Sequence, residues 1–275
     1  MRESAGKSAF VTGGASGIGL ALGRALAEAG CRVMLADIEE SALADAVGTL
    51  GEIGPEIRGI VCDVADPDLV DRAAGEAIAA FGSIHVLCNN AGVAGGSGIE
   101  AISLASWRWV IDVNLMGVVH GLAALLPHMR AHGEGGHIVN TASMAGLLSD
   151  GGMGFSPYSA SKYAVVAMSE GLAAELQPHG IGVSVLCPGF VRTRIAEAGR
   201  SRPARYGAHV ASPRTAAVTE LVRAGMDPKA VADRVLAAIR DDELYIFTHS
   251  DYRPAVEARF ARILAAFDRA EDAER

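Results

Sequence analysis

The sequence predicts an α/β fold, with helices on both faces of a doubly wound parallel sheet of about seven strands. Longer amphipathic segments alternate with short apolar runs, an arrangement typical of parallel sheets covered by helices. The expected strands lie near residues 8–12, 31–37, 57–62, 84–88, 136–141, 181–187 and 243–247. Because the connections must be right-handed, a nucleotide is expected beyond the carboxyl ends of the strands, where the strand order reverses.

The composition excludes several classes of protein. The 275 residues, 50% of them hydrophobic, are enough for one large domain. No apolar stretch reaches the ~18 residues of a membrane span, and the polar start 1–7 has no secretory pattern. A formal net charge of −8 without a basic patch argues against nucleic-acid binding. We therefore expect a cytoplasmic protein that binds neither a membrane nor nucleic acid.

The four cysteines lie in or beside the strand-like runs, at Cys31, Cys62, Cys88 and Cys187. Their spacing is not that of metal ligands, so no metal site is expected. We interpret them as buried free thiols in a reducing compartment.

The first expected strand leads into a glycine-rich turn, Thr12–Gly19, and then into a helical stretch from Leu20 to Ala29. A strand, a glycine-rich turn and a helix N-terminus together present backbone N–H groups to a pyrophosphate. The spacing is G-x-x-x-G-x-G, which differs from the usual G-x-G-x-x-G. Asp37 ends the second apolar run, where an acid accepts hydrogen bonds from an adenosine ribose. The alternative for Asp37 is an N-cap of the next helix.

Tyr158 and Lys162 are four residues apart, so on a helix they share a face. A free phenol has a pKa of about 10, and a neighbouring ammonium favours the phenolate. The pair therefore predicts a tyrosine that exchanges a proton near neutral pH. Alone it is weak evidence, since exposed Tyr/Lys neighbours are common.

Two further groups of polar residues follow expected strands. Asn89–Gly92 comes after the apolar run 84–88, and Asn114 follows on a helix. Ser143 comes at the end of the run 139–143. With the turn and the Tyr/Lys pair, these motifs resemble the short-chain dehydrogenase/reductase family over nearly the whole chain. The resemblance also rests on P-G-x-x-x-T, which begins at Pro188 and ends at Thr193.

The resemblance implies a Rossmann-like fold, with residues 1–275 forming one dinucleotide-binding and catalytic domain. It implies that Tyr158 is the general base for alcohol oxidation and the general acid for carbonyl reduction. Lys162 is expected to lower the pKa of Tyr158 and to reach the nicotinamide ribose. Ser143 is expected to bind the substrate oxygen, and Asn114 to hold a water that links Lys162 to solvent. The alternatives are a structural strand-end serine and a helix-kink or capping asparagine.

The charge of Asp37 predicts NAD as the cofactor. At ~4 Å and an effective dielectric near 20, each unit of charge on the extra phosphate of NADP is repelled by roughly 4 kcal/mol. Relatives that use NADP often carry a base at position 16 or 38. Here these residues are Ser16 and Ile38, so no base offsets the repulsion by Asp37. By resemblance, Asp63 binds the adenine amino group. The expected cofactor contacts are Gly13, Ser16, Gly17, Ile18, Gly19, Asp37, Asp63, Val64, Asn90, Ala91, Gly92, Tyr158, Lys162, Pro188, Gly189, Val191 and Thr193.

The segment 190–226 is expected to border the substrate site. Its seven arginines belong either to a mobile lid or, for most of them, to a solvated cover. With 241–246, this segment resembles bacterial Cα-dehydrogenases that oxidise benzylic alcohols of aryl ethers. The resemblance implies a bulky secondary alcohol as the substrate, with an aromatic alcohol as one alternative. The loop 150–154 adds two residues to the usual family spacing between serine and tyrosine. If the alignment is displaced there, Ser149 and Ser156 are the alternatives to Ser143.

The complete set of motifs favours an NAD-dependent enzyme that interconverts a secondary alcohol and a ketone. The alternatives are a carbonyl or 3-oxoacyl-type reductase, a related lyase or epimerase, and a nucleotide-binding regulator without turnover. The helices near 103–130 and 158–178 resemble those of the family's dimer contact, so a homodimer or homotetramer is expected. The sequence does not specify the physiological substrate, the stereochemistry or the direction of the reaction.

Overall fold

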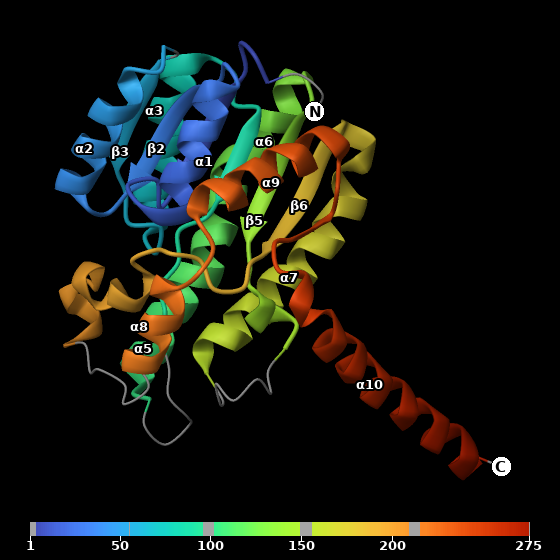
Figure 1. The fold of residues 1–275 in the computed structure, drawn as a ribbon. Helices are drawn as coiled ribbons and strands as arrows, with labels where there is room; N and C mark the ends of the chain where they lie inside the picture. The colour runs from blue at the N-terminus through green and yellow to red at the C-terminus, as the bar shows by residue number, and fades with distance from the viewer. Residues whose placement is uncertain (1–3, 55, 96–101, 149–155, 209–214, 275) are drawn as a thin grey trace.

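The computed structural model describes residues 4–54, 56–95, 102–148, 156–208 and 215–274. Within these residues one parallel sheet has the strand order β3-β2-β1-β4-β5-β6-β7 (Figure 1). The strands are β1 (Ser8–Thr12), β2 (Arg32–Asp37), β3 (Ile57–Val61), β4 (Val86–Asn89), β5 (Gly136–Thr141), β6 (Ile181–Cys187) and β7 (Tyr245–Phe247). The predicted doubly wound sheet is confirmed. Its order reverses between β1 and β4, the point at which such folds bind nucleotides.

Helices cover both faces of the sheet, and each face has its own apolar core. On one face α1 (Gly17–Glu28), α2 (Glu40–Gly51) and α9 (Pro228–Asp241) bury residues such as Leu22, Leu43 and Val235. On the other face lie α3 (Pro67–Phe81), α6 (Gly117–His132) and α7 (Pro157–Leu176). Strands buried on both faces carry apolar residues almost continuously, which is why they were recognisable as short apolar runs.

Helix α5 (Leu104–Ile111) continues into α6 through one π-helical turn, Asp112–Met116. This 29-residue helical segment, 104–132, is long and apolar enough to cross a bilayer by length and composition alone. However, 44% of its apolar window is buried inside the protein, where it contributes Trp109 and Leu125 to the core. Core helices of globular proteins have the same character.

The segment after β6 contains two short 3₁₀ helices, Ile195–Ser201 and Ala204–Tyr206, followed by α8 (Thr215–Arg223). It lies beside α5 at the carboxyl ends of the strands (Figure 1). The last helix, α10 (Arg253–Glu274), extends away from the rest of the chain (Figure 1).

All four cysteines are free and buried, as expected. Burial raises the pKa of the Cys31 thiol to about 11 and those of Cys62, Cys88 and Cys187 to about 12, from an ordinary value of 9.0. Because the folded-state pKa values are raised, the stability that these thiols contribute is present below pH 9 and is lost as the pH rises toward 11–12.

We predict that the free energy of unfolding falls between pH 9 and 11. Each thiol contributes a slope of about 1.4 kcal/mol per pH unit in this range, because it ionises only in the unfolded chain. Cys88→Ala removes one such group and reduces the slope by that amount. Urea unfolding of both chains across this pH range measures the difference, and equal slopes would contradict the prediction.

Candidate active site

A crevice with a volume of about 520 Å³ lies at the carboxyl ends of the strands. Of the site residues predicted from the sequence, all except Gly19 and Asn114 line it. Gly19 lies beneath the glycine-rich turn, where a Cβ would come 2.0 Å from the Gly13 carbonyl oxygen. The structure therefore brings together residues from the ends of six strands and from α7.

The glycine-rich turn has the backbone geometry that a phosphate group requires. Gly13 and Gly17 have φ angles of 65° and 55°, values that favour glycine. Helix α1 begins at Gly17, and the N-cap residue Ser16 makes no side-chain capping bond. The first N–H groups of α1 therefore border the crevice without a side-chain cap, as an anion site at a helix N-terminus needs.

The Thr12 hydroxyl joins this turn to the loop after β4. It accepts hydrogen bonds from the backbone N–H groups of Asn90 and Ala91, at 2.9 and 3.0 Å. In return the Asn90 amide donates to the Thr12 carbonyl at 3.0 Å. These contacts fix the two loops relative to each other across the point where the strand order reverses.

Two carboxylates line the crevice near the carboxyl ends of β2 and β3. Asp37 is the last residue of β2, and Asp63 lies two residues after β3. Asp37 accepts hydrogen bonds from the N–H groups of Ala15 and Glu39, at 2.9 and 3.0 Å. Glu39, and not Asp37, is the N-cap residue of α2, so the capping alternative for Asp37 is wrong. Asp63 accepts from Ala65 N–H with one oxygen and from the Arg205 guanidinium with the other.

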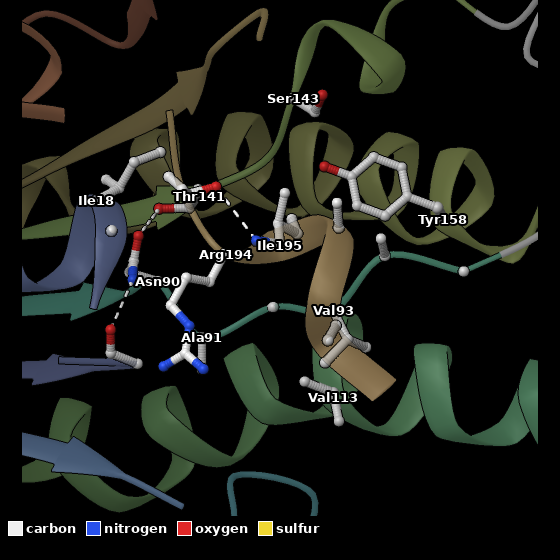
Figure 2. A pocket seen from close by; sticks show the side chains of 18 of the residues that line it. Ile18, Asn90, Ala91, Val93, Val113, Thr141, Ser143, Tyr158, Arg194 and Ile195 are labelled. Atoms are coloured by element: carbon white, nitrogen blue, oxygen red, sulfur yellow. Dashed lines mark hydrogen bonds between the residues drawn. The ribbon is translucent and has the colours of Figure 1, made fainter. Parts of the chain in front are cut away.

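Tyr158 lies in the first turn of α7, with its hydroxyl directed toward Ser143 (Figure 2). Ser156 caps this helix by accepting a hydrogen bond from Tyr158 N–H at 3.0 Å. The hydroxyl of Ser156 also donates to the Gly95 carbonyl. Ser156 therefore has a capping bond of its own, whereas Ser149 and the loop 150–154 lie outside the described residues.

The side chain of Lys162 lies beneath Tyr158. Its ammonium is 5.7 Å from the centre of the Tyr158 ring and donates to the Thr141 carbonyl at 2.7 Å. Lys162 is 3% exposed, and this burial lowers its pKa to about 8. The pair thus shares one face of α7, as the four-residue spacing predicted.

The structure corrects the expected lowering of the Tyr158 pKa. Burial raises the pKa of this phenol, and a hydrogen bond from Ser143 opposes the shift. The lysine is 5.7 Å from the ring centre and its own charge is disfavoured by burial, so its effect does not exceed that of desolvation.

Asn114 lies in the π-helical turn between α5 and α6 and is fully buried. Its side-chain oxygen accepts from Val93 N–H at 2.8 Å, and its amide donates to the Val93 carbonyl at 3.0 Å. The amide also donates to the Ser161 hydroxyl on α7 at 3.3 Å. Asn114 therefore holds the loop after β4 against α7, behind the wall of the crevice.

Several lining residues were not identified from the sequence. Tyr252, just after β7, closes one side and packs against Gly189. Trp109 of α5 lies under the guanidinium of Arg202, 4.8 Å from the ring centre. Aromatic side chains at these positions carry no local pattern that connects them with the turn at 12–19, so only the fold brings them to the site.

Five of the six described arginines after β6 are exposed, which agrees with a solvated cover, but three of the six also make specific contacts. Among those described, Arg200 pairs with Glu39, Arg205 pairs with Asp63, and Arg202 stacks on Trp109, so these three contact the body of the protein. In addition, Arg194 and Arg200 bring positive charge to Glu39, two residues beyond Asp37, where the sequence suggested none. The positions that were compared, 16 and 38, are local, whereas these arginines come from a distant segment.

The fold and the crevice define a nucleotide-binding α/β protein of the doubly wound class. The family model for short chain dehydrogenases matches residues 7–204. The chain belongs to the short-chain dehydrogenase/reductase family and is an enzyme of that family.

Among its relatives, a C alpha-dehydrogenase of Sphingobium sp. (strain NBRC 103272 / SYK-6) is 36% identical over 96% of this chain and 87% of that protein. A 1-deoxy-11-beta-hydroxypentalenate dehydrogenase of Streptomyces avermitilis is 38% identical over 92% of this chain and 88% of that protein. The solved structure of a short chain dehydrogenase/reductase from Burkholderia phymatum in complex with NAD is 41% identical, covers 97% of both chains and has a TM-score of 0.91.

Proposed function

We propose that the enzyme oxidises a bulky secondary alcohol to a ketone with NAD, using Tyr158 as the general base. The observation that carries the proposal is the Tyr158 hydroxyl facing Ser143, with Lys162 beneath the ring, in a crevice that also contains the phosphate-binding turn. In the opposite direction Tyr158 returns the proton and the product is an alcohol. When bound, oxidised NAD accepts the hydride from the carbinol carbon.

The residues of the chain supply orientation and proton handling. Ser143 donates a hydrogen bond to the substrate oxygen, where negative charge develops as the proton leaves. Tyr158 takes that proton, and the Lys162 ammonium stabilises the resulting phenolate. Lys162 also reaches the hydroxyls of the nicotinamide ribose. Asn114 fixes the Val93 backbone and the Ser161 hydroxyl behind Lys162, which positions a water for proton exchange with solvent.

The chain's own residues fit a dinucleotide. The turn at Gly13 and Gly17 presents the N-terminus of α1 to a pyrophosphate, and Asp37 and Asp63 receive the ribose and the adenine amino group. Gly19 allows the Gly13 backbone to lie close to the start of α1, since a side chain at position 19 would meet the Gly13 carbonyl.

The character of the remaining lining supports an uncharged, bulky substrate. Apolar and aromatic side chains predominate in the crevice, among them Trp109, Met144, Leu148, Val222 and Tyr252. The C alpha-dehydrogenase relative agrees with the resemblance that implied an aromatic, benzylic alcohol, and the 1-deoxy-11-beta-hydroxypentalenate dehydrogenase supports a hydroxyl-bearing substrate of another class. We propose that the segment 190–226 is the lid over this site.

A screen of secondary alcohols with NAD tests the function. We expect nicotinamide absorbance at 340 nm to rise with 1-aryl alcohols and bulky alicyclic alcohols. A flat trace for both classes, and for the corresponding ketones with NADH, would favour a regulator without turnover.

The cofactor preference is a separate prediction. We expect kcat/KM for NAD to exceed that for NADP by at least tenfold, because Asp37 repels a phosphate on the adenosine ribose. Steady-state kinetics with a fixed alcohol measure the ratio, and a preference for NADP would contradict the assignment.

We also propose that the protein is a cytoplasmic homodimer or homotetramer. We propose that α10 takes part in the contact between protomers. Its exposed apolar side chains recur at helical spacing, at Phe260, Ile263, Leu264 and Phe267. Light scattering of the full chain is expected to give a mass of two or four protomers, and a monomer mass would count against the proposal.

A further inference from the structure

Glu39 lies two residues beyond Asp37 and is held by arginines from the segment after β6. The Arg200 guanidinium donates to both oxygens of the Glu39 carboxylate, at 2.7 and 3.0 Å, across 161 residues of sequence. Arg194 comes within 3.9 Å of the same carboxylate. The Arg200 guanidinium also donates to the backbone carbonyl of Arg194, at 2.9 Å.

These groups lie at the end of the crevice where Asp37 is located. Glu39, Arg194 and Arg200 all line the crevice, and Figure 2 shows Arg194 extending into it. The Glu39 N–H donates to Asp37 at 3.0 Å, so the two carboxylates belong to one small structural unit. The side chains of Glu39 and Arg200 are only 23% and 25% exposed, which makes this pair less solvated than most ion pairs of the chain.

At this end the Glu39 carboxylate meets two guanidinium groups, and Arg194 also lies 3.5 Å from the Glu197 carboxylate. An arginine that binds a carboxylate with two parallel hydrogen bonds has the geometry to bind a phosphate in the same way. If Glu39 did not occupy them, Arg200 and Arg194 would offer a dianion two positive charges beside the adenosine ribose.

We propose that Glu39 is a second determinant of dinucleotide selectivity, because it occupies Arg200 and Arg194 and so denies them to a 2′-phosphate. The inference rests on the proposed function, in which Asp37 receives the adenosine ribose. The two acids act differently: Asp37 repels the phosphate directly, whereas Glu39 removes the bases that would attract it.

Direct binding of NADH and NADPH, followed by nicotinamide fluorescence without substrate, tests this inference. We expect Glu39→Gln to lower the Kd for NADPH at least tenfold and to change the Kd for NADH by less than threefold. The double variant Glu39→Gln/Arg200→Gln should lose the gain. Glu257→Gln, which breaks the Arg253–Glu257 pair on α10, is the matched control and should leave both Kd values unchanged.

A purely structural ion pair gives a different result. If the pair only anchors the segment after β6, Glu39→Gln weakens the binding of both dinucleotides to the same extent, and the inference is overturned. It is also overturned if the NADPH gain is absent, or if it persists without Arg200. Failure of the wild-type chain to bind NADH would overturn the proposed function as well, whereas normal NADH binding with an unchanged NADPH Kd overturns this inference alone.

Discussion

Tyr158→Phe is expected to reduce kcat for alcohol oxidation by roughly three orders of magnitude, the contribution of a positioned general acid–base. The substitution removes one oxygen atom and retains the ring that covers Lys162. The Kd for NADH should therefore stay within about threefold of the wild-type value. Turnover is measured by absorbance at 340 nm and binding by fluorescence titration of the same preparation.

Tyr163→Phe is the matched control for this substitution. Tyr163 follows Lys162 on the same helix, and its hydroxyl is buried without a hydrogen-bond partner in the described part of the chain. Removing that oxygen should leave kcat unchanged, because the phenol has no contact with the proposed proton path. Near wild-type turnover in Tyr158→Phe, or an equal loss in both variants, would contradict the role of Tyr158.

The structure gives the direction in which the Tyr158 pKa is shifted. Burial raises the pKa of this phenol and so opposes the loss of its proton, whereas a neighbouring ammonium favours the phenolate. This balance could not be derived from the sequence. The four-residue spacing predicts that two groups meet, but the direction of a pKa shift depends on desolvation, which is a property of the whole fold.

The strands were predictable because their signal is local. A strand of a parallel sheet that is buried on both faces is mostly apolar, and β1 (Ser8–Thr12) and β6 (Ile181–Cys187) lie where the apolar runs predicted them. The polar residues that follow such strands meet at one edge of the sheet. This geometric consequence of parallel packing is why the residues predicted for the site share one crevice.

Contacts between distant segments were not predictable. Arg200 and Glu39 are 161 residues apart, and nothing in either local pattern connects them. Tyr252 and Trp109 also line the crevice although they come from distant segments of the chain. The charge argument for NAD was therefore incomplete: its conclusion about Asp37 rests on two neighbouring positions, whereas the fold brings two bases from a distant segment to Glu39, two residues beyond Asp37.

Gly19→Ala is expected to weaken NADH binding by at least a hundredfold. An added Cβ would lie 2.0 Å from the Gly13 carbonyl oxygen and 2.6 Å from the Asn90 amide nitrogen. The first of these atoms belongs to the backbone of the turn, so the clash cannot be relieved by rotating a side chain. The turn must open, which moves Gly13 and the start of α1 away from the positions that a pyrophosphate needs.

Gly48→Ala provides the contrast, because the added methyl group is the same and its surroundings differ. Gly48 is exposed in the middle of α2, and a Cβ there meets nothing within 4 Å. Alanine should stabilise the helix by about 0.5–1 kcal/mol and leave the NADH Kd unchanged. Overpacking at Gly19 should instead cost about 1–3 kcal/mol of stability in addition to the loss of binding. Thermal unfolding and fluorescence titration of both variants measure these effects, and NADH binding by Gly19→Ala within threefold of wild type would show that the close approach of the turn is not required.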